Sequence, residues 1–155
     1  MSNATIAIQN TIVQVNEYDL LTISNYSWFL KHGKPATTLA FPNYYVYSRR
    51  VHRVQIPMDR LLYKLTPNSN AKIIHQDGNG LDCRRSTMRL VPRNPKQTTF
   101  IGTIFYDNRW HFEYGGQYHG PYPTEWDAAV ARDRFLFPIV GWSKSYKYNF
   151  YPNLL

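Results

Sequence analysis

His75 is the residue of this chain whose type and setting could support chemistry most directly. A histidine with one free ring nitrogen can take a proton from water near neutral pH. The segment Lys72-Ile73-Ile74-His75 is apolar and short, and the turn Asp77-Gly78-Asn79-Gly80 follows it closely. Such a pattern predicts a strand that ends at the histidine and a tight loop after it. The pattern therefore places one histidine at the end of a strand, next to a tight loop.

The segments that must position His75 predict an α+β fold. Apolar alternation predicts a strand or hairpin over residues 5–15 and strands over 44–54 and 72–75. Capping residues predict helices over residues 16–24 and 57–64, and residues 84–90 are expected to be helical and then extended. Further strands are expected over residues 100–106, 110–114 and 118–122, with turns at residues 32–35, 107–108 and 115–116. A last helix should begin at Thr124, in a sequence with capping-box spacing, and end at Pro138.

Composition limits the classes of protein to which the chain can belong. It has 155 residues, of which 43% are hydrophobic, so it can bury a core. No apolar run approaches the roughly 20 residues of a membrane span, and no signal peptide precedes the first predicted strand. The single cysteine, Cys83, excludes an internal disulfide and is expected to be a buried small residue. We therefore expect no membrane partner and a cytoplasmic location.

Charge is unevenly distributed along the sequence. Residues 1–100 hold 13 of the 18 Lys and Arg residues and 5 of the 10 Asp and Glu residues. Residues 101–155 hold 5 of each, so the net charge of +8 comes from the first part of the chain. A basic segment of this kind is typical of a protein that binds a polyanion, although a solvated basic face has the same composition.

The segment around His75 resembles the core of an HNH homing endonuclease of the phage type. The matching frame consists of His75, Gly78, Asn79, Leu81, Asp82, Arg84 and Arg85. The resemblance implies a ββα-metal-like domain in which one histidine activates water and one divalent cation binds the scissile phosphate. It also implies that an aspartate before the histidine and an asparagine from a helix hold the cation.

This chain departs from the family pattern at the positions that carry the chemistry. The metal aspartate falls on Ile74, the middle asparagine on Thr87 and the late asparagine near Lys96, with Asn94 as an alternative alignment. We therefore expect no metal, and Mg²⁺ or Mn²⁺ only if nuclease activity persists with His75 as base and Asp59 as substitute ligand. Otherwise His75 is a hydrogen-bonded remnant of the fold. The loop residues expected to be structural are Asp77, Gly78, Asn79 and Asp82.

The last third of the chain resembles an AP2 domain, in which one helix backs three antiparallel strands. The matching residues are Gly102, Arg109-Trp110, Gly120, Tyr122-Pro123-Thr124, Ala128-Ala129, Ala131-Arg132-Asp133 and Asn149-Phe150. HNH followed by AP2 is an arrangement of phage homing endonucleases, so the two resemblances support each other. They imply an HNH-like basic domain over residues 1–97 and an AP2-like β-β-β-α domain over residues 98–155.

Two groups of arginines are candidates for phosphate contacts. They are Arg49, Arg50 and Arg53, and Arg84, Arg85, Arg89 and Arg93. The AP2-like strands carry as many acids as bases and many aromatic residues, which favours a protein partner over DNA. The interface candidates there are Trp110, Phe112, Tyr114 and Tyr118.

Three functions remain open at this point. The first is a catalytically inactive protein derived from an HNH homing endonuclease that binds nucleic acid, DNA rather than RNA, or a nucleoprotein. The second is a structural subunit of a larger assembly such as a phage particle, which would place it in the virion. The third is a divergent metal-dependent DNA endonuclease. The isoleucine at residue 74 favours the non-catalytic functions, since it cannot hold a cation.

Overall fold

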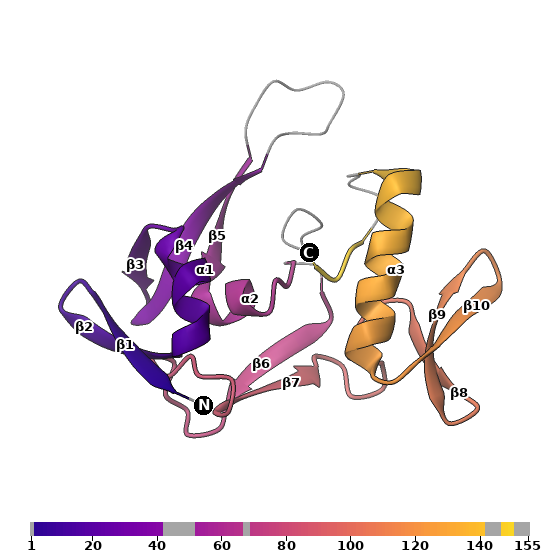
Figure 1. The fold of residues 1–155 in the computed structure, drawn as a ribbon, viewed down its shortest axis with the longest axis horizontal. Helices are drawn as coiled ribbons and strands as arrows, with labels where there is room; N and C mark the ends of the chain where they lie inside the picture. The colour runs from indigo at the N-terminus through magenta and orange to yellow at the C-terminus, as the bar shows by residue number, and fades with distance from the viewer. Residues whose placement is uncertain (1, 42–51, 67–68, 142–146, 151–155) are drawn as a thin grey trace. The chain divides into compact units, whose positions relative to one another are not determined.

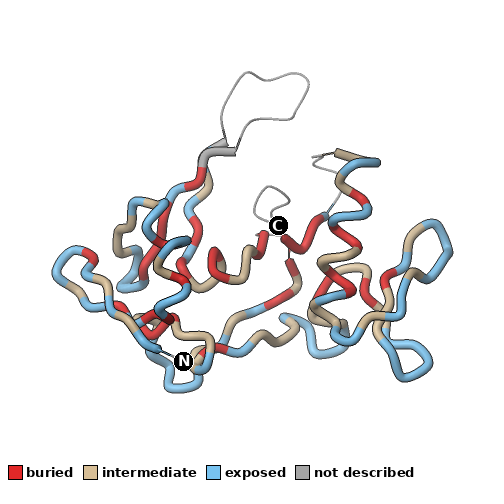
Figure 2. The backbone as a smooth tube through the Cα atoms, in the orientation of Figure 1, coloured by how far each residue is buried: buried red, intermediate tan, exposed pale blue. Residues whose placement is uncertain are grey.

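The computed structural model describes residues 2–41, 52–66, 69–141 and 147–150. The chain is α+β, with several small antiparallel sheets and few helices, as its sequence predicts (Figure 1). It forms two compact units, each with its own buried residues (Figure 2). The first unit comprises Met1–Tyr63 and Ile73–Leu90, and the second comprises Lys64–Lys72 and Val91–Leu155.

The sequence predicts one domain boundary, after residue 97, whereas the two units are divided at several points of the chain. Strands β6 (Ala71–His75) and β7 (Met88–Pro92) each begin in one unit and end in the other. The second unit therefore includes residues 64–72 and 91–97. Nine Lys and Arg and five Asp and Glu belong to each unit, so the net positive charge is shared equally between them.

The first unit begins with a hairpin of β1 (Asn3–Ile8) and β2 (Thr11–Asn16). Its two turn residues, Gln9 and Asn10, have φ of 48° and 65°, which suits the tight turns that fit the twist of a hairpin. A 3₁₀ turn, Glu17–Asp19, then leads into α1 (Leu20–Ser24), within the helix predicted for residues 16–24.

A three-stranded sheet follows, with β4 (Lys34–Phe41) between β3 (Trp28–Lys31) and β5 (His52–Pro57). The turn between β3 and β4 is His32-Gly33, so the strand begins inside the turn predicted for residues 32–35. Helix α2 (Met58–Leu62) starts directly after β5 and is shorter than the predicted helix over residues 57–64. The core of the unit is formed by the hairpin, α1, α2 and the segment after β6. Its buried residues include Val13, Val15, Ile23, Met58, Leu62, Cys83 and Met88.

The segment before β7 differs from its prediction. Residues 84–87 form turns instead of a helix, with the amide of Thr87 donating to the carbonyl of Arg84 at 3.1 Å. The extended strand begins at Met88, one residue later, so there is no room for a second helical turn.

The second unit contains a sheet in the order β10-β9-β8, made of β8 (Thr103–Tyr106), β9 (Arg109–Tyr114) and β10 (Gln117–Tyr122). Its hairpin turns, Asp107-Asn108 and Gly115-Gly116, stand where the sequence predicts them and have positive φ at both residues. Helix α3 (Glu125–Val140) packs on this sheet, and its buried face includes Ala128, Ala129, Asp133 and Leu136 (Figures 1 and 2).

Helix α3 begins as predicted and ends later than predicted. The Thr124 hydroxyl accepts the Asp127 amide at 3.1 Å, which caps the first turn. Pro138 lies inside the helix, whose last residue is Val140. The helix stops at Gly141, which has a φ of 68° and donates its amide to the Phe137 carbonyl at 2.9 Å. Within the described residues, no helix is long and apolar enough to cross a membrane.

Candidate functional site

The loop that follows His75 is held by its own polar side chains. Asp77 Oδ1 accepts the Asn79 amide at 2.9 Å, and Asn79 Oδ1 accepts the Leu81 amide at 3.0 Å. Gly78 has a φ of 71°, a region that glycine adopts at low cost. At the base of the loop, the amide of Gln76 donates to the carbonyl of Thr87 at 2.8 Å. Side chains of Asp and Asn commonly fix turns in this way, so the loop is rigid for reasons that are independent of catalysis.

The same loop is docked on strand β2. The Gln14 amide donates to the Leu81 carbonyl at 2.9 Å, and the Cys83 amide donates to the Gln14 carbonyl at 2.8 Å. The fully buried Asn16 accepts the amide of Arg85 at 2.8 Å. Cys83 is 1% exposed, and burial raises the pKa of its thiol to about 12. Cys83 is therefore a core residue, held in the thiol form that is a poor nucleophile.

His75 lies between two acceptors. Its Nδ1 is 2.9 Å from the carbonyl oxygen of Asp82, and its Nε2 is 3.1 Å from Oδ2 of Asp59. The side chains of His75 and Asp59 are 7% and 15% exposed. Asp59 stands in the first turn of α2, where its Oδ1 accepts the Arg60 amide at 2.6 Å. The structure thus brings together the two residues that the sequence offers for catalysis.

This arrangement suits an ion pair better than a general base. A base needs a ring nitrogen whose lone pair points at the water that it deprotonates. Both nitrogens of His75 instead face oxygen atoms, so a ring that carries both protons satisfies both contacts. Each ring nitrogen is thus occupied by a protein oxygen, and the side chain is only 7% exposed, which leaves little access for a water.

The residues at the family's metal positions do not fit a divalent cation. Ile74 is 36% exposed and has no donor atom, and the Thr87 hydroxyl donates to the Arg84 carbonyl at 2.9 Å. Both oxygens of Asp59 are engaged, by His75 and by the Arg60 amide. In the described ranges, no three His, Cys, Asp or Glu side chains are grouped as ligands. A hard cation prefers several oxygen ligands, which these residues do not supply.

The helix that would bring the late asparagine to the cation is missing from the segment after β7. Residues 93–102 are all described, and they form turns and bends with no helix. Asn94 Oδ1 accepts the Lys96 amide at 3.1 Å, and the Gln97 amide donates to the Asn94 carbonyl at 3.0 Å. Asn94 is thus used to fix a turn. This holds whether the late asparagine of the HNH pattern is aligned with Lys96 or with Asn94.

Two of the arginines expected to contact phosphate make internal contacts. Arg84 donates from Nε to Asp82 Oδ1 at 2.8 Å, and this hydrogen bond holds the pKa of Asp82 below its usual range. Arg85 donates to Asp19 at 3.2 Å and to the Leu62 carbonyl at 2.8 Å, with its guanidinium 4.8 Å from the Tyr63 ring centroid. Arg85 therefore braces the first unit, and its assignment to a phosphate surface is not supported by these contacts.

The other arginines of the two groups differ in setting. Arg53, Arg89 and Arg93 are exposed, whereas Arg49 and Arg50 lie outside the described residues.

Near the loop that follows His75, here called the histidine loop, a hollow of about 360 Å³ is lined by polar and apolar residues that include Lys31, His32 and Lys34. A Cβ atom on Gly80 would lie 2.9 Å from Lys34 Cε, so the lysine stem rests against the loop. Sequence reasoning treated residues 32–35 only as a turn, although two lysines and a histidine within residues 31–34 were a visible signal.

The aromatic interface candidates of the second unit also differ from one another. Phe112 is 2% exposed and stacks on His119 with ring centroids 4.7 Å apart, so its assignment to an exposed interface is wrong. Trp110 and Tyr114 are half-buried against Phe105 and Phe135. Tyr118 is 51% exposed and lies beside Tyr106, with ring centroids 5.5 Å apart. Strand alternation explains the difference, because Phe112 faces α3 and Tyr118 does not.

Comparisons of the chain with protein-family models, curated proteins and solved structures find no match. The chemistry of the site therefore has to be argued from its own residues. The decisive ones are His75, with both ring nitrogens engaged, and Ile74, which has no donor atom.

Proposed function

We propose that this chain is a non-catalytic nucleic-acid-binding protein built on the frame of an HNH–AP2 homing endonuclease, with DNA as its ligand. The observation that carries the non-catalytic part is the contact of Asp59 Oδ2 with His75 Nε2 at 3.1 Å. It places a carboxylate at the nitrogen that a hydrolytic base would use, and Ile74 leaves the neighbouring metal position without a ligand.

The binding part rests on exposed cations of the first unit. Arg53 and Arg89 are exposed, and Lys31 and Lys34 line the hollow beside the histidine loop. No carboxylate lines that hollow among the described residues. Cations arranged in this way contact phosphates irrespective of sequence and release counterions when they bind.

The family frame rests on the order and type of the elements. A strand ending at His75, a braced loop and a returning strand match the first part of an HNH motif. Three antiparallel strands followed by one capped helix match the AP2 pattern. The turns over residues 93–102 depart from that frame, which has a helix with a metal-binding asparagine there. This departure supports a protein that keeps the loop after His75 but does not bind the cation.

The proposal is tested by measuring cleavage and binding with the same protein. Supercoiled plasmid with Mg²⁺ or Mn²⁺ should remain intact, and labelled duplex DNA should bind with an affinity that falls steeply with salt. Arg53→Gln and Arg89→Gln should each reduce the slope of log affinity against log salt by about one. Arg109→Gln, an exposed arginine of the second unit, is the matched control and should leave the slope unchanged. Affinity that does not depend on salt contradicts the proposal.

A divergent metal-dependent endonuclease is a second candidate, favoured by the closeness of His75 to a carboxylate that the sequence names as a substitute ligand. Metal-dependent nicking of the plasmid that His75→Ala abolishes would establish it. The same result would exclude the non-catalytic proposal.

A structural subunit of a larger assembly is a third candidate, favoured by the exposed rings of Tyr106 and Tyr118 on the second unit. Exposed aromatic residues are enriched at protein interfaces. Recovery of the chain in a stoichiometric complex that Tyr106→Ala and Tyr118→Ala together disrupt would favour this candidate.

A further inference from the structure

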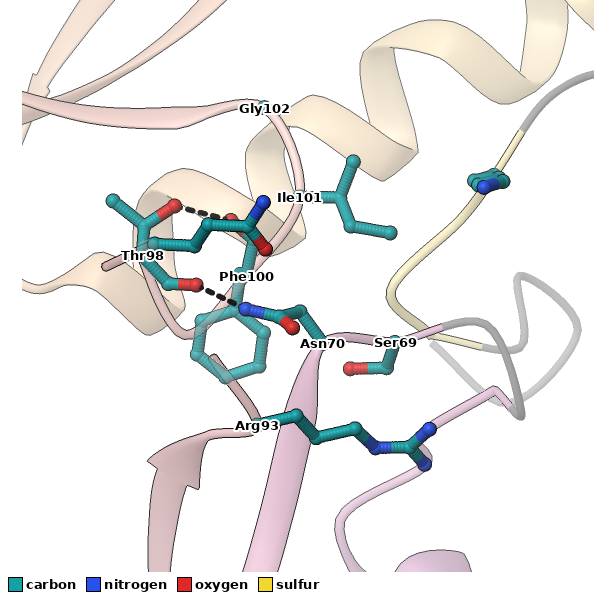
Figure 3. A pocket seen from close by; sticks show the side chains of 9 residues that line it. Ser69, Asn70, Arg93, Thr98, Phe100, Ile101 and Gly102 are labelled. Carbon is teal, nitrogen blue, oxygen red and sulfur yellow. Dashed lines mark hydrogen bonds between the residues drawn. The ribbon is translucent and has the colours of Figure 1, made fainter. Parts of the chain in front are cut away.

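The second unit contains a cavity of about 490 Å³ whose lining comes from three stretches of the chain. The lining residues are Ser69 and Asn70 in the first stretch, Arg93, Gln97, Thr98, Phe100, Ile101 and Gly102 in the second, and Lys147 in the third. Figure 3 shows Ser69 and Asn70 between Arg93 on one side and Ile101 on the other. The volume lies within the range of about 300–1,000 Å³ that is usual for small-ligand sites.

The walls of the cavity are tied to one another by hydrogen bonds. Asn70 Nδ2 donates to the Thr98 carbonyl at 2.7 Å (Figure 3). The Arg93 amide donates to the Asn70 carbonyl at 2.8 Å. Ile101 and Asn149 exchange two hydrogen bonds, of 2.6 and 3.0 Å, which hold the far wall to the chain end that carries Lys147. The cavity is therefore formed before any ligand arrives, which lowers the entropic cost of binding.

The cavity is positively charged and has no carboxylate in its lining. Arg93 and Lys147 line it, and neither side chain has a hydrogen bond or ion pair with a described residue. All five side-chain carboxylates of the second unit belong to described residues, and none lines the cavity. The buried Asp133 is paired with Arg132 at 2.8 Å. The two lining cations thus lack an anion.

The rest of the lining fits an organic group attached to that anion. Ile101 contributes apolar surface, and Gln97 and Asn70 contribute amides that can pair with the edge of a base. Phe100 also borders the cavity, but it is buried, with its ring packed against Trp126 and Phe150. The cavity is much larger than an inorganic phosphate needs. Arginine and lysine together are common binders of phosphate oxygens.

We propose that this cavity binds a nucleoside monophosphate, with Arg93 and Lys147 on the phosphate and the wall of Ile101 and Gln97 beside the nucleoside. The ligand is a free nucleotide or the 5′-phosphorylated end of a nucleic acid strand, which share this chemistry. The site belongs to the second unit alone and does not depend on the DNA contacts proposed for the first unit.

The test is calorimetric titration of the full chain with adenosine 5′-monophosphate, adenosine and inorganic phosphate. The nucleotide should bind more tightly than either fragment, because it occupies both the charged and the apolar wall. Arg93→Gln and Lys147→Gln should each weaken binding by about tenfold, as expected for loss of a charged hydrogen bond. Arg109→Gln is the control, since Arg109 is exposed on β9 outside the cavity and its loss should change nothing.

Two further measurements keep the outcome decisive. Thermal unfolding of the variants should match the wild-type protein, because both side chains are exposed. Amide NMR signals of Ile101 and Gly102 should shift when the nucleotide is added to the wild-type protein. Absence of nucleotide binding, equal affinity of wild type and both variants, or equal affinity for adenosine overturns the proposal.

The two sources of the phosphate are separated with oligonucleotides. A single strand that binds about tenfold more tightly with a 5′-phosphate than with a 5′-hydroxyl, and loses this difference in Arg93→Gln, identifies strand ends as the ligand. Binding of the free nucleotide without such a difference identifies the free nucleotide. Either result supports the cavity. The smaller salt slope expected for DNA binding by Arg53→Gln and Arg89→Gln concerns the first unit and leaves this result unaffected.

Discussion

The imidazole Nε2 of His75 lies 3.1 Å from Oδ2 of Asp59, and this contact joins the end of β6 to the first turn of α2. Nδ1 of the same ring lies 2.9 Å from the Asp82 carbonyl, so the histidine also fixes the loop that follows it. The histidine that the sequence offers as a candidate base is thus at the centre of a structural connection among three segments of the first unit. His75 therefore has a structural role that does not depend on any catalytic activity.

The first prediction concerns the strength of this connection. Asp59→Ala and His75→Ala should each lower the free energy of unfolding by about 1–3 kcal/mol, because each leaves a buried polar partner without its hydrogen bond. The double variant should lose less than the sum of the two, with a coupling energy of about 0.5–3 kcal/mol. Urea unfolding at pH 7 measures all four proteins. Strictly additive losses would show that the contact contributes nothing to stability.

The second prediction concerns the three positions at which an HNH nuclease would carry its metal-site residues. Ile74→Asp, Thr87→Asn and Lys96→Asn in one protein should produce no nicking of plasmid in Mg²⁺ or Mn²⁺. Asp59 still engages His75 Nε2 in this variant, and residue 96 stands in a turn where the family requires a helix. An agarose gel assay with a metal-dependent nuclease as positive control measures the outcome. Nicking that a further His75→Ala change removes would show that a base and a cation site can still form.

Local patterns in the sequence were sufficient to predict the second unit's sheet and the start of its helix. Dipeptides that favour positive φ mark Asp107-Asn108 and Gly115-Gly116, and Thr124 marks the cap. Strands β3 and β4 were missed, since Ala36 and Thr37 are both buried and give no alternation to detect. Pro138 was misjudged because a proline two residues before a helix end removes only one hydrogen bond that the last turn can spare.

Contacts between distant segments were beyond the reach of such patterns. Asp59 was named as a possible metal ligand, but its pairing with His75, 16 residues away, depends on how α2 packs against the end of β6. The cavity beside Arg93 and Lys147 joins residues more than 50 positions apart, and no motif marks it. Phe112 is buried because its face of β9 packs against α3. The sequence of β9 alone does not show which of its two faces does so.

The third prediction tests the assignment of aromatic residues in the second unit. Phe112→Ala should lower the free energy of unfolding by about 3–5 kcal/mol, because the ring is buried between β9 and α3. Tyr118→Ala should change it by about 0.5 kcal/mol or less, because that ring is 51% exposed. Chemical denaturation of the two variants gives the comparison. Equal losses would mean that Tyr118 is also part of the core.

The fourth prediction concerns Cys83. Burial raises the pKa of its thiol to about 12, so the native protein holds very little thiolate at pH 8. Alkylation by iodoacetamide at pH 8 should be slower by about a thousandfold or more than in the unfolded chain, where the thiol titrates normally. Mass spectrometry of samples quenched over time, with and without urea, measures the two rates. Rapid native modification would place Cys83 at the surface.

The fifth prediction is a pH dependence that originates at Asp82. The hydrogen bond from Arg84 holds the pKa of Asp82 below its usual value in the folded protein. A carboxyl group with a depressed folded pKa stabilises the fold above its unfolded pKa, about 3.9, and loses that effect as pH falls through the folded value. Asp82→Asn should therefore be less stable than the wild-type protein at pH 7.

The difference between the two proteins should shrink once the pH falls below about 4 and disappear when the wild-type carboxyl is protonated. Urea midpoints between pH 2 and pH 7 measure this trend. Asp107→Asn is the matched control, because Asp107 lies in the exposed turn between β8 and β9 and the same change of charge should leave the pH profile unaltered. The stability difference between Asp82→Asn and the wild-type protein could instead persist unchanged to pH 2. That outcome would assign the effect to shape and hydrogen bonding, with no contribution from the negative charge of the Asp82 carboxylate.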